Sequence, residues 1–170
     1  MSTGPGPLRC AALWATAALL VDCGLPQVTL EGMACDAQHA CIAEHTCIVN
    51  QCRVALVPSA LVLDRETLAP GETVAGSVTY TNPGTLSLEV KDIVIAVRVP
   101  GANPDQGPFD DDMEPEKTNS TLGPGESVTL NAHRQMAADA PTGRWMTYPT
   151  WVDSADDYHD GPFYYFTVSR

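Results

Sequence analysis

The stretch TVAGSVTYTN, Thr73–Asn82, decides the fold class of this chain. Val74, Val78 and Tyr80 alternate with small or hydroxylated residues, so every second side chain is suited to a buried face. The run ends at Asn82-Pro83-Gly84, a strong turn signal, because proline and glycine favour turn dihedrals. The stretch therefore predicts a half-buried β-strand that ends in a tight turn.

Further segments with strand character follow between turns that recur about every ten residues, and none from Val54 onward has a helical apolar period. Six to eight short strands separated by Pro/Gly turns predict an all-β, antiparallel sandwich. This part has no cysteine, so aromatic side chains must fill its core: Trp145, Tyr148, Trp151, Phe163 and Tyr165. The segments are 59–64, 86–100 (one bent strand or two shorter ones), 127–136, 144–153 and 163–169.

Two predicted turns have the same sequence pattern. Residues 68–74, LAPGETV, and 122–128, LGPGESV, have the form L-x-P-G-E-[ST]-V, in which proline presets one turn dihedral and glycine supplies the positive one. With the segment PTGRWMTYPTWVDS, this order resembles the bacterial immunoglobulin-like (CARDB-like) domains of secreted and surface proteins. The resemblance spans most of residues 60–168. It implies an immunoglobulin-like sandwich of about seven strands that serves as a spacer, an adhesin or a carbohydrate-binding accessory.

The N-terminus has the features of an export signal. Residues 11–21, AALWATAALLV, are uncharged and mostly apolar but too short for a permanent membrane span. They fit the apolar region of a signal peptide over residues 1–22, although a buried helix is the alternative. Leu20-Val21-Asp22-Cys23 resembles a bacterial lipobox, which implies lipidation of Cys23, but Asp22 replaces the family's small residue. The alternative is ordinary cleavage near residues 22–24. We expect an exported lipoprotein of the outer membrane or cell surface, or otherwise a secreted or periplasmic protein.

After Cys23, four cysteines remain, all between residues 35 and 52: Cys35, Cys41, Cys47 and Cys52. An even, local set in an exported chain predicts two disulfides. Zinc modules space their cysteines differently, although His39 and His45 offer a second kind of metal ligand. The ending CIVNQCR resembles short Cys-rich modules of exported proteins. Three pairings are possible, and analogy with interlaced knots favours Cys35–Cys47 with Cys41–Cys52. The expected organisation is a linker (23–34), a Cys-rich module (35–53) and a sandwich (54–170).

Acidic residues dominate the charge. The formal net charge of −12 disfavours a nucleic-acid partner, and we expect membrane attachment through a lipid anchor alone. Two acidic stretches, if they are loops at one end of a sandwich, would offer carboxylates to Ca²⁺. The alternative is a pair of solvated loops. The candidate calcium ligands are Asp110, Asp111, Asp112, Asp156 and Asp157; no other cofactor is expected.

Catalytic motifs are absent from the sequence: it has no G-x-S-x-G elbow and no H-E-x-x-H pair. A row of exposed aromatic rings would stack on sugars or on a protein partner. We therefore expect a non-catalytic binding or adhesion module for carbohydrate or a cell-envelope protein. The alternatives are a structural spacer without a ligand and, less favoured, an accessory domain of a hydrolase system. The candidate ligand-binding residues are Trp145, Tyr148, Trp151 and Tyr164.

Overall fold

The computed structural model describes residues 31–41, 45–103 and 111–170. The predicted signal peptide, Cys23 and Asp110 lie outside these residues. The described residues form twelve strands and no helix, so the all-β prediction is confirmed. Within this part of the chain there is consequently no apolar helix of the length that crosses a bilayer.

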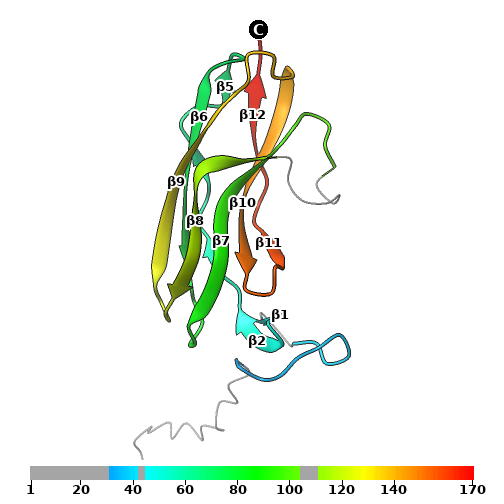
Figure 1. Ribbon diagram of the computed structural model, residues 1–170, viewed down its shortest axis with the longest axis vertical. Coiled ribbons are helices and arrows are strands. Elements are labelled where there is room, and N and C mark those ends of the chain that lie inside the picture. The colour runs from blue at the N-terminus through cyan, green and yellow to red at the C-terminus, as the bar shows by residue number, and fades with distance from the viewer. Residues whose placement is uncertain (1–30, 42–44, 104–110) are drawn as a thin grey trace, which may run out of the picture.

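The first two strands form a hairpin, and the other ten form one curled sheet (Figure 1). The hairpin strands are β1 (His45–Ile48) and β2 (Gln51–Val54). The sheet strands are β3 (Val57–Pro58), β4 (Val62–Leu63), β5 (Thr67–Leu68), β6 (Thr73–Thr81), β7 (Leu88–Arg98), β8 (Asp111–Leu122), β9 (Ser127–Gln135), β10 (Gly143–Asp153), β11 (Tyr158–Asp160) and β12 (Tyr164–Val168).

The sheet runs in the order β3-β6-β9-β8-β7-β10-β12-β5, with β4 beside β6 and β11 beside β10. All its pairings are antiparallel except that of β5 with β12, which is parallel. Strand β8 pairs with β7 along most of its length but with β9 only at Glu114–His133. The sheet therefore curls into a half-barrel around one apolar core, with β8 as the link between its two parts.

The two parts of the sheet contact each other through the core. The Tyr80 hydroxyl on β6 is fully buried and donates a hydrogen bond to the carbonyl oxygen of Thr150 on β10, at 3.0 Å. This burial raises the pKa of the Tyr80 phenol far above its ordinary value, with a smaller contribution from the Asp160 carboxylate. The core cluster draws on β6, β7, β9, β10 and β12.

Strand β6 matches the prediction from residues 73–82, with Val74, Val78 and Tyr80 buried and the intervening residues partly exposed. The predicted segment 86–100 forms a single strand, β7, whose pairing with β8 has a register shift between Ile93 and Ile95. The curled sheet has ten strands rather than the expected seven or so, because the short strands β3, β4, β5 and β11 add two or three residues each.

The repeated L-x-P-G-E turn has the same geometry at both sites. Gly71 and Gly125 have φ values of 88° and 72°, a region that glycine enters without steric cost. The glutamates add a contact that the sequence analysis missed: the Glu72 and Glu126 carboxylates accept hydrogen bonds from the backbone N–H groups of Ala69 and Gly123, at 2.7 and 2.6 Å. The glutamate of the motif therefore closes each turn.

Candidate functional site: a groove between the disulfide module and the curled sheet

The disulfide module, residues 31–41 and 45–54, is a small hairpin with two cross-links. Cys35 is bonded to Cys47 and Cys41 to Cys52, the pairing that the resemblance to interlaced knots favours. Strands β1 and β2 are joined by Val49 and Asn50, with φ values of 50° and 57°, as in the tight turns that fit the twist of a hairpin. Residues 31–34, from the predicted linker, are held to this hairpin by backbone hydrogen bonds between Gly32 and Cys52 and between Cys52 and Met33.

The module is packed against one end of the curled sheet. Ile48, only 2% exposed, belongs to the same buried cluster as the sheet residues. The Glu31 carboxylate accepts hydrogen bonds from the backbone N–H and the hydroxyl of Thr85, in the β6–β7 loop, at 2.6 and 2.5 Å. A Cβ atom added at Gly84 would lie 2.4 Å from Glu31 Oε1, so glycine at this position leaves room for the carboxylate. The module and the sheet are thus joined by an apolar contact and a carboxylate clamp.

The Glu31 clamp depends on pH. Partial burial opposes ionisation of Glu31, but the hydrogen bonds from Thr85 and neighbouring backbone groups outweigh it and lower the carboxyl pKa below 4.5. A lowered folded-state pKa contributes stability that is present above the unfolded value and is lost as the pH falls through the folded value. We expect the amide signals of Gly84 and Thr85 to change on acidification below pH 4.5 as the module loosens.

The matched variant is Glu31→Gln, which cannot titrate. Its Gly84 and Thr85 amide signals are expected to be independent of pH across that window, whereas Asp139→Asn at the far end of the sheet retains the wild-type profile. Amide NMR spectra recorded between pH 6 and pH 3 make this comparison. An unchanged transition in Glu31→Gln would contradict the clamp.

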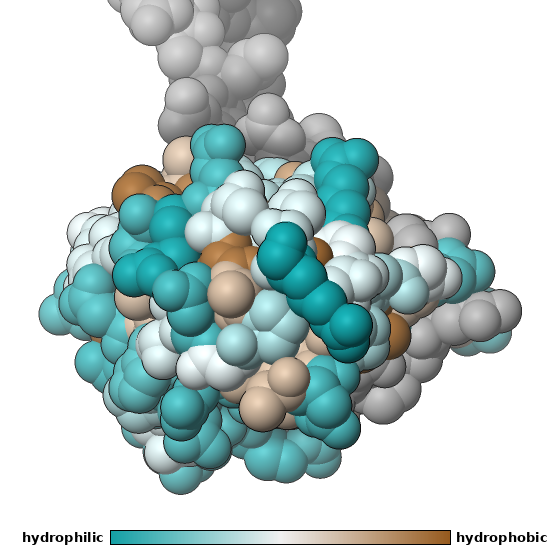
Figure 2. All heavy atoms as spheres, turned by 90° about the horizontal axis from the view of Figure 1, so that it is seen from above, coloured by the Kyte–Doolittle hydropathy of each residue, from teal (hydrophilic) through white to brown (hydrophobic). Residues whose placement is uncertain are grey.

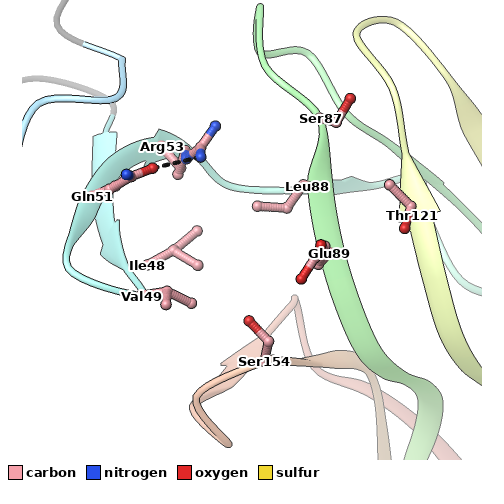
Figure 3. A pocket seen from close by; sticks show the side chains of 9 residues that line it. All are labelled: Ile48, Val49, Gln51, Arg53, Ser87, Leu88, Glu89, Thr121 and Ser154. Carbon is pink, nitrogen blue, oxygen red and sulfur yellow. Dashed lines mark hydrogen bonds between the residues drawn. The ribbon is translucent and has the colours of Figure 1, made fainter.

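A groove of about 300 Å³ lies where the module meets the sheet (Figure 3). Ile48 and Leu88 are buried side chains at its base, and the exposed Val49 adds apolar surface. The remaining side chains are polar, and the Arg53 guanidinium donates a hydrogen bond to the Gln51 side chain at 2.6 Å. The module contributes Ile48, Val49, Gln51 and Arg53; the sheet and its loops contribute Ser87, Leu88, Glu89, Thr121 and Ser154.

A second hollow extends the groove along β7 and β8. It shares Glu89, Thr121 and Ser154 with the first and continues to Lys91 and Asn119. The combined surface has an apolar base with hydroxyl, amide and charged groups around it, and it carries both signs of charge. Such a surface is suited to hydrogen bonding with an elongated polar ligand.

The side chains of the predicted aromatic ligand-binding row are buried or packed against the core. Trp145, Tyr148 and Trp151 are 6%, 1% and 2% exposed, and Tyr164 packs against the core. Strand β10 lies between β7 and both β11 and β12, and side chains cover both of its faces. Alternation along β10 therefore does not separate buried from exposed residues.

Each β10 aromatic has a specific partner. Trp145 stacks on Phe166, with ring centroids 6.1 Å apart, and Tyr148 meets Phe163 edge-on at 5.2 Å. The Tyr148 hydroxyl also accepts a hydrogen bond from Nε of buried Arg98, at 3.0 Å. The aromatic rings that are more than a third exposed in the described residues, those of Tyr158, Phe163 and Tyr165, do not line the groove.

The two acidic stretches that were expected to share a calcium ion lie far apart along the sheet, as far as the described residues show. Asp111 and Asp112 begin strand β8, opposite Val97 and Ala96 of β7, whereas Asp153 pairs with Val90 near the other end of β7. Seven residues of strand separate these positions along β7, which is about 23 Å. Asp111 pairs with Arg134, and Asp156 with Lys91. In the described residues, the one group of three or more potential ligands in close proximity is Cys35, Cys41 and Cys52, and these are disulfide-bonded.

Asp111 and Asp112 belong to strand β8, whereas the calcium hypothesis requires their acidic stretch to be a loop. In the structure, only Met113 and Leu122 of β8 are buried. Burial and the neighbouring Asp111 and Glu114 carboxylates raise the pKa of Asp112. The hollow around Asp112, Glu114, Glu116 and His133 is open and acidic, and it is separate from the module groove.

A buried Asp–His pair at the β10–β11 turn has a structural role. Asp153, fully buried, accepts hydrogen bonds from the backbone N–H groups of Ala155 and Asp157, and its second oxygen lies 3.2 Å from His159 Nε2. The imidazole stacks on Trp151, with ring centroids 4.0 Å apart. These contacts fix the turn that carries Ser154 into the groove.

The comparisons with known proteins give likeness of fold only. No protein-family description matches the sequence. No curated protein matches it either.

Among solved structures, the sporulation control protein Spo0M from Bacillus subtilis aligns at 15% identity and a TM-score of 0.47, covering 68% of this chain and 50% of that one. A β-glucosidase from Erythrobacter marinus (13% identity) and β-glucosidase 3B from Thermotoga neapolitana (17%) align with the same TM-score over 68% of this chain. The alignments cover 15% and 16% of those two chains. The chain thus spans half or less of these proteins, and their activities are not carried over to it.

Proposed function

We propose that this protein is an exported, non-catalytic binding module, in which an immunoglobulin-like sandwich and a disulfide module together bind an extended segment of a cell-envelope protein. The groove at their junction is the observation that carries the proposal. Its two walls come from residues 48–53 and 87–154, so the site exists only while the module is docked on the sheet. A rigid, composite groove of this kind presents a preformed surface, which lowers the entropy cost of binding.

The immunoglobulin-like interpretation is supported by the way the two parts of the half-barrel face each other, as the Tyr80–Thr150 hydrogen bond across the core illustrates. Export is supported by the two disulfides, which persist in oxidising compartments.

A lipid anchor at Cys23 would attach the exported protein to a membrane. Intact mass of the protein isolated from its native membrane tests the anchor: it should equal that of residues 23–170 with two disulfides plus the lipid.

A protein ligand is favoured over a carbohydrate because of what lines the groove. Sugar-binding sites that rely on stacking need exposed aromatic rings, and the predicted rings of Trp145, Tyr148 and Trp151 are in the core. The groove instead offers apolar Val49 beside Arg53 and Glu89, a combination suited to side chains and backbone amides of a peptide.

The end of the molecule that carries the C-terminus is largely hydrophilic, with scattered apolar residues (Figure 2).

Site-specific photo-crosslinking tests this function. A photoreactive residue at Val49, on the groove, is expected to give discrete adducts with an envelope protein in intact cells. The same residue at Val62, which is 64% exposed on the edge strand β4, is expected to give none of them. Glu89→Lys should abolish the Val49 adducts, while Glu66→Lys near the opposite end of the sheet should leave them unchanged.

The outcomes separate the candidate functions. Adducts with glycan and no protein would favour a carbohydrate ligand. The same adducts from both positions, or none from either while the protein is present at normal abundance, would contradict the groove and favour a spacer role.

A further inference from the structure

The groove carries one charge of each sign, on opposite walls. Arg53 comes from β2 of the disulfide module, and Glu89 comes from β7 of the sheet. Figure 3 shows the buried Leu88 side chain between the two charged groups. Ile48 and Val49 add apolar surface from the module. An apolar centre is therefore flanked by a cation on one side and by an anion on the other.

Neither charge is paired within the described part of the chain. The Arg53 guanidinium donates to the uncharged Gln51 side chain, and it forms no ion pair with a carboxylate of the described residues. Glu89 has no basic partner there either, and Lys91, two positions along β7, is paired with Asp156. Although acidic side chains outnumber basic ones by 21 to 9, those of the described residues leave Arg53 available to an incoming anionic group.

An extended peptide can contact both charges and the apolar centre at once. Side chains on one face of an extended segment occur at every second position, about 6.6–6.8 Å apart. Three such side chains would face the groove, while the intervening ones point away from it. The polar groups of Asn119, Thr121 and Ser154 lie along the adjoining hollow, where they can donate to and accept from the backbone of the segment.

We infer that the groove, in the peptide-binding role proposed above and resting on it, selects segments with an aliphatic residue flanked two positions away by an acidic residue on one side and a basic residue on the other. The acidic side chain pairs with Arg53 and the basic one with Glu89. The aliphatic side chain packs on Val49 and Leu88. Such solvated ion pairs add modest affinity, but they give specificity because a like charge at either position is repelled. The acidic end of the segment therefore lies toward the disulfide module.

Selection from a random peptide library displayed on phage tests this specificity, with the full chain and both disulfides intact. Peptides enriched on the wild type should show the acidic, aliphatic and basic residues at alternate positions. Selection on R53E should lose the acidic preference alone, and selection on E89K should lose the basic preference alone. R144E and E66K, which lie near the other end of the sheet, should enrich the wild-type pattern.

Exchange of charge between protein and peptide gives a sharper measurement. In fluorescence anisotropy titrations, replacing the acidic residue of a selected peptide by alanine should weaken its binding to the wild type about 2–5-fold. Replacing the same residue by lysine should weaken binding further, because it places a second cation beside Arg53. The lysine peptide should bind R53E more tightly than it binds the wild type, a gain that a merely structural role of Arg53 would not produce.

The specificity and the proposed function can fail separately. Enriched peptides that no longer bind V49D, but that show no acidic or basic preference, would overturn the specificity and leave the groove as a peptide site. Failure of R53E to favour the lysine peptide would overturn the specificity in the same way. If no peptide is enriched, or if the enriched peptides bind V49D as tightly as the wild type, the proposed function itself is contradicted and the specificity with it.

Discussion

Replacement of Trp151 by alanine is expected to lower the free energy of unfolding by about 3–5 kcal/mol, among the largest effects of any single substitution in this chain. The indole is 2% exposed, belongs to the core cluster and stacks on His159. Its removal leaves a cavity and deprives the imidazole of its contact, which in turn loosens the turn held by Asp153. Urea denaturation with the disulfides intact, followed by far-UV circular dichroism, measures the loss.

The matched control is Tyr165→Ala on β12. Tyr165 is 38% exposed, and the Arg144 guanidinium lies 3.6 Å from its ring centroid, a contact whose loss costs about 1 kcal/mol or less. If Trp151→Ala unfolded at the same urea concentration as the wild type but no longer bound a sugar, the assignment of Trp151 to the core would be wrong. The prediction that Trp151 stacks on sugar rings would then be supported.

Replacement of Asn82 by alanine is expected to cost about 2–4 kcal/mol, because three hydrogen bonds are lost at a buried position. The Asn82 side chain is 1% exposed and donates to the carbonyl oxygens of Leu86 and Leu122, both at 2.9 Å. It also accepts a hydrogen bond from Gly84 N–H at 2.9 Å. One amide thus ties the β6–β7 loop to the end of β8, beside the loop residue that binds Glu31.

Two variants sharpen the Asn82 experiment. Asn82→Asp keeps the acceptor for Gly84 but loses both donors and buries a carboxylate, so it should be at least as destabilising at neutral pH and less so in acid. Asn131→Ala, at an exposed position on β9, should change stability by less than about 0.5 kcal/mol. Denaturation midpoints at pH 7 and pH 4 measure the stability of all three variants. If Asn82→Ala lowered the free energy of unfolding no more than Asn131→Ala does, the role given to Asn82 would be contradicted.

The strands that could be predicted from the sequence are those with one buried and one exposed face. Strand β6 alternates cleanly, and both L-x-P-G-E turns fold as their proline and glycine predict. Strand β8 could not be predicted in this way, because polar and charged side chains fill most of its length and only Met113 and Leu122 are buried. In β10, the alternation of side chains between the two faces wrongly predicted an exposed aromatic face, because neighbouring segments cover the second face of this strand.

The candidate site was harder to predict because its parts are distant in sequence. Glu31 and Thr85 are separated by 54 positions, and neither stands in a motif. Asn82 was recognisable only as part of an Asn-Pro-Gly turn, and its hydrogen bond to the distant Leu122 carbonyl leaves no local sequence pattern. The cysteine count, in contrast, pointed to two disulfides, since that inference needs only number, spacing and compartment.

The parallel pairing of β5 with β12 has a kinetic consequence. Thr67 lies opposite Thr167, a separation of 100 residues (167 − 67), so this edge forms only when segments from both ends of the described sheet are available. Pairings between distant segments slow folding, because a large loop must close before the contacts form. A ribosome releases the β12 segment about 100 residues after the β5 segment, and until then the β5 edge lacks its partner. This edge of the sheet therefore closes only after the β12 segment has left the ribosome.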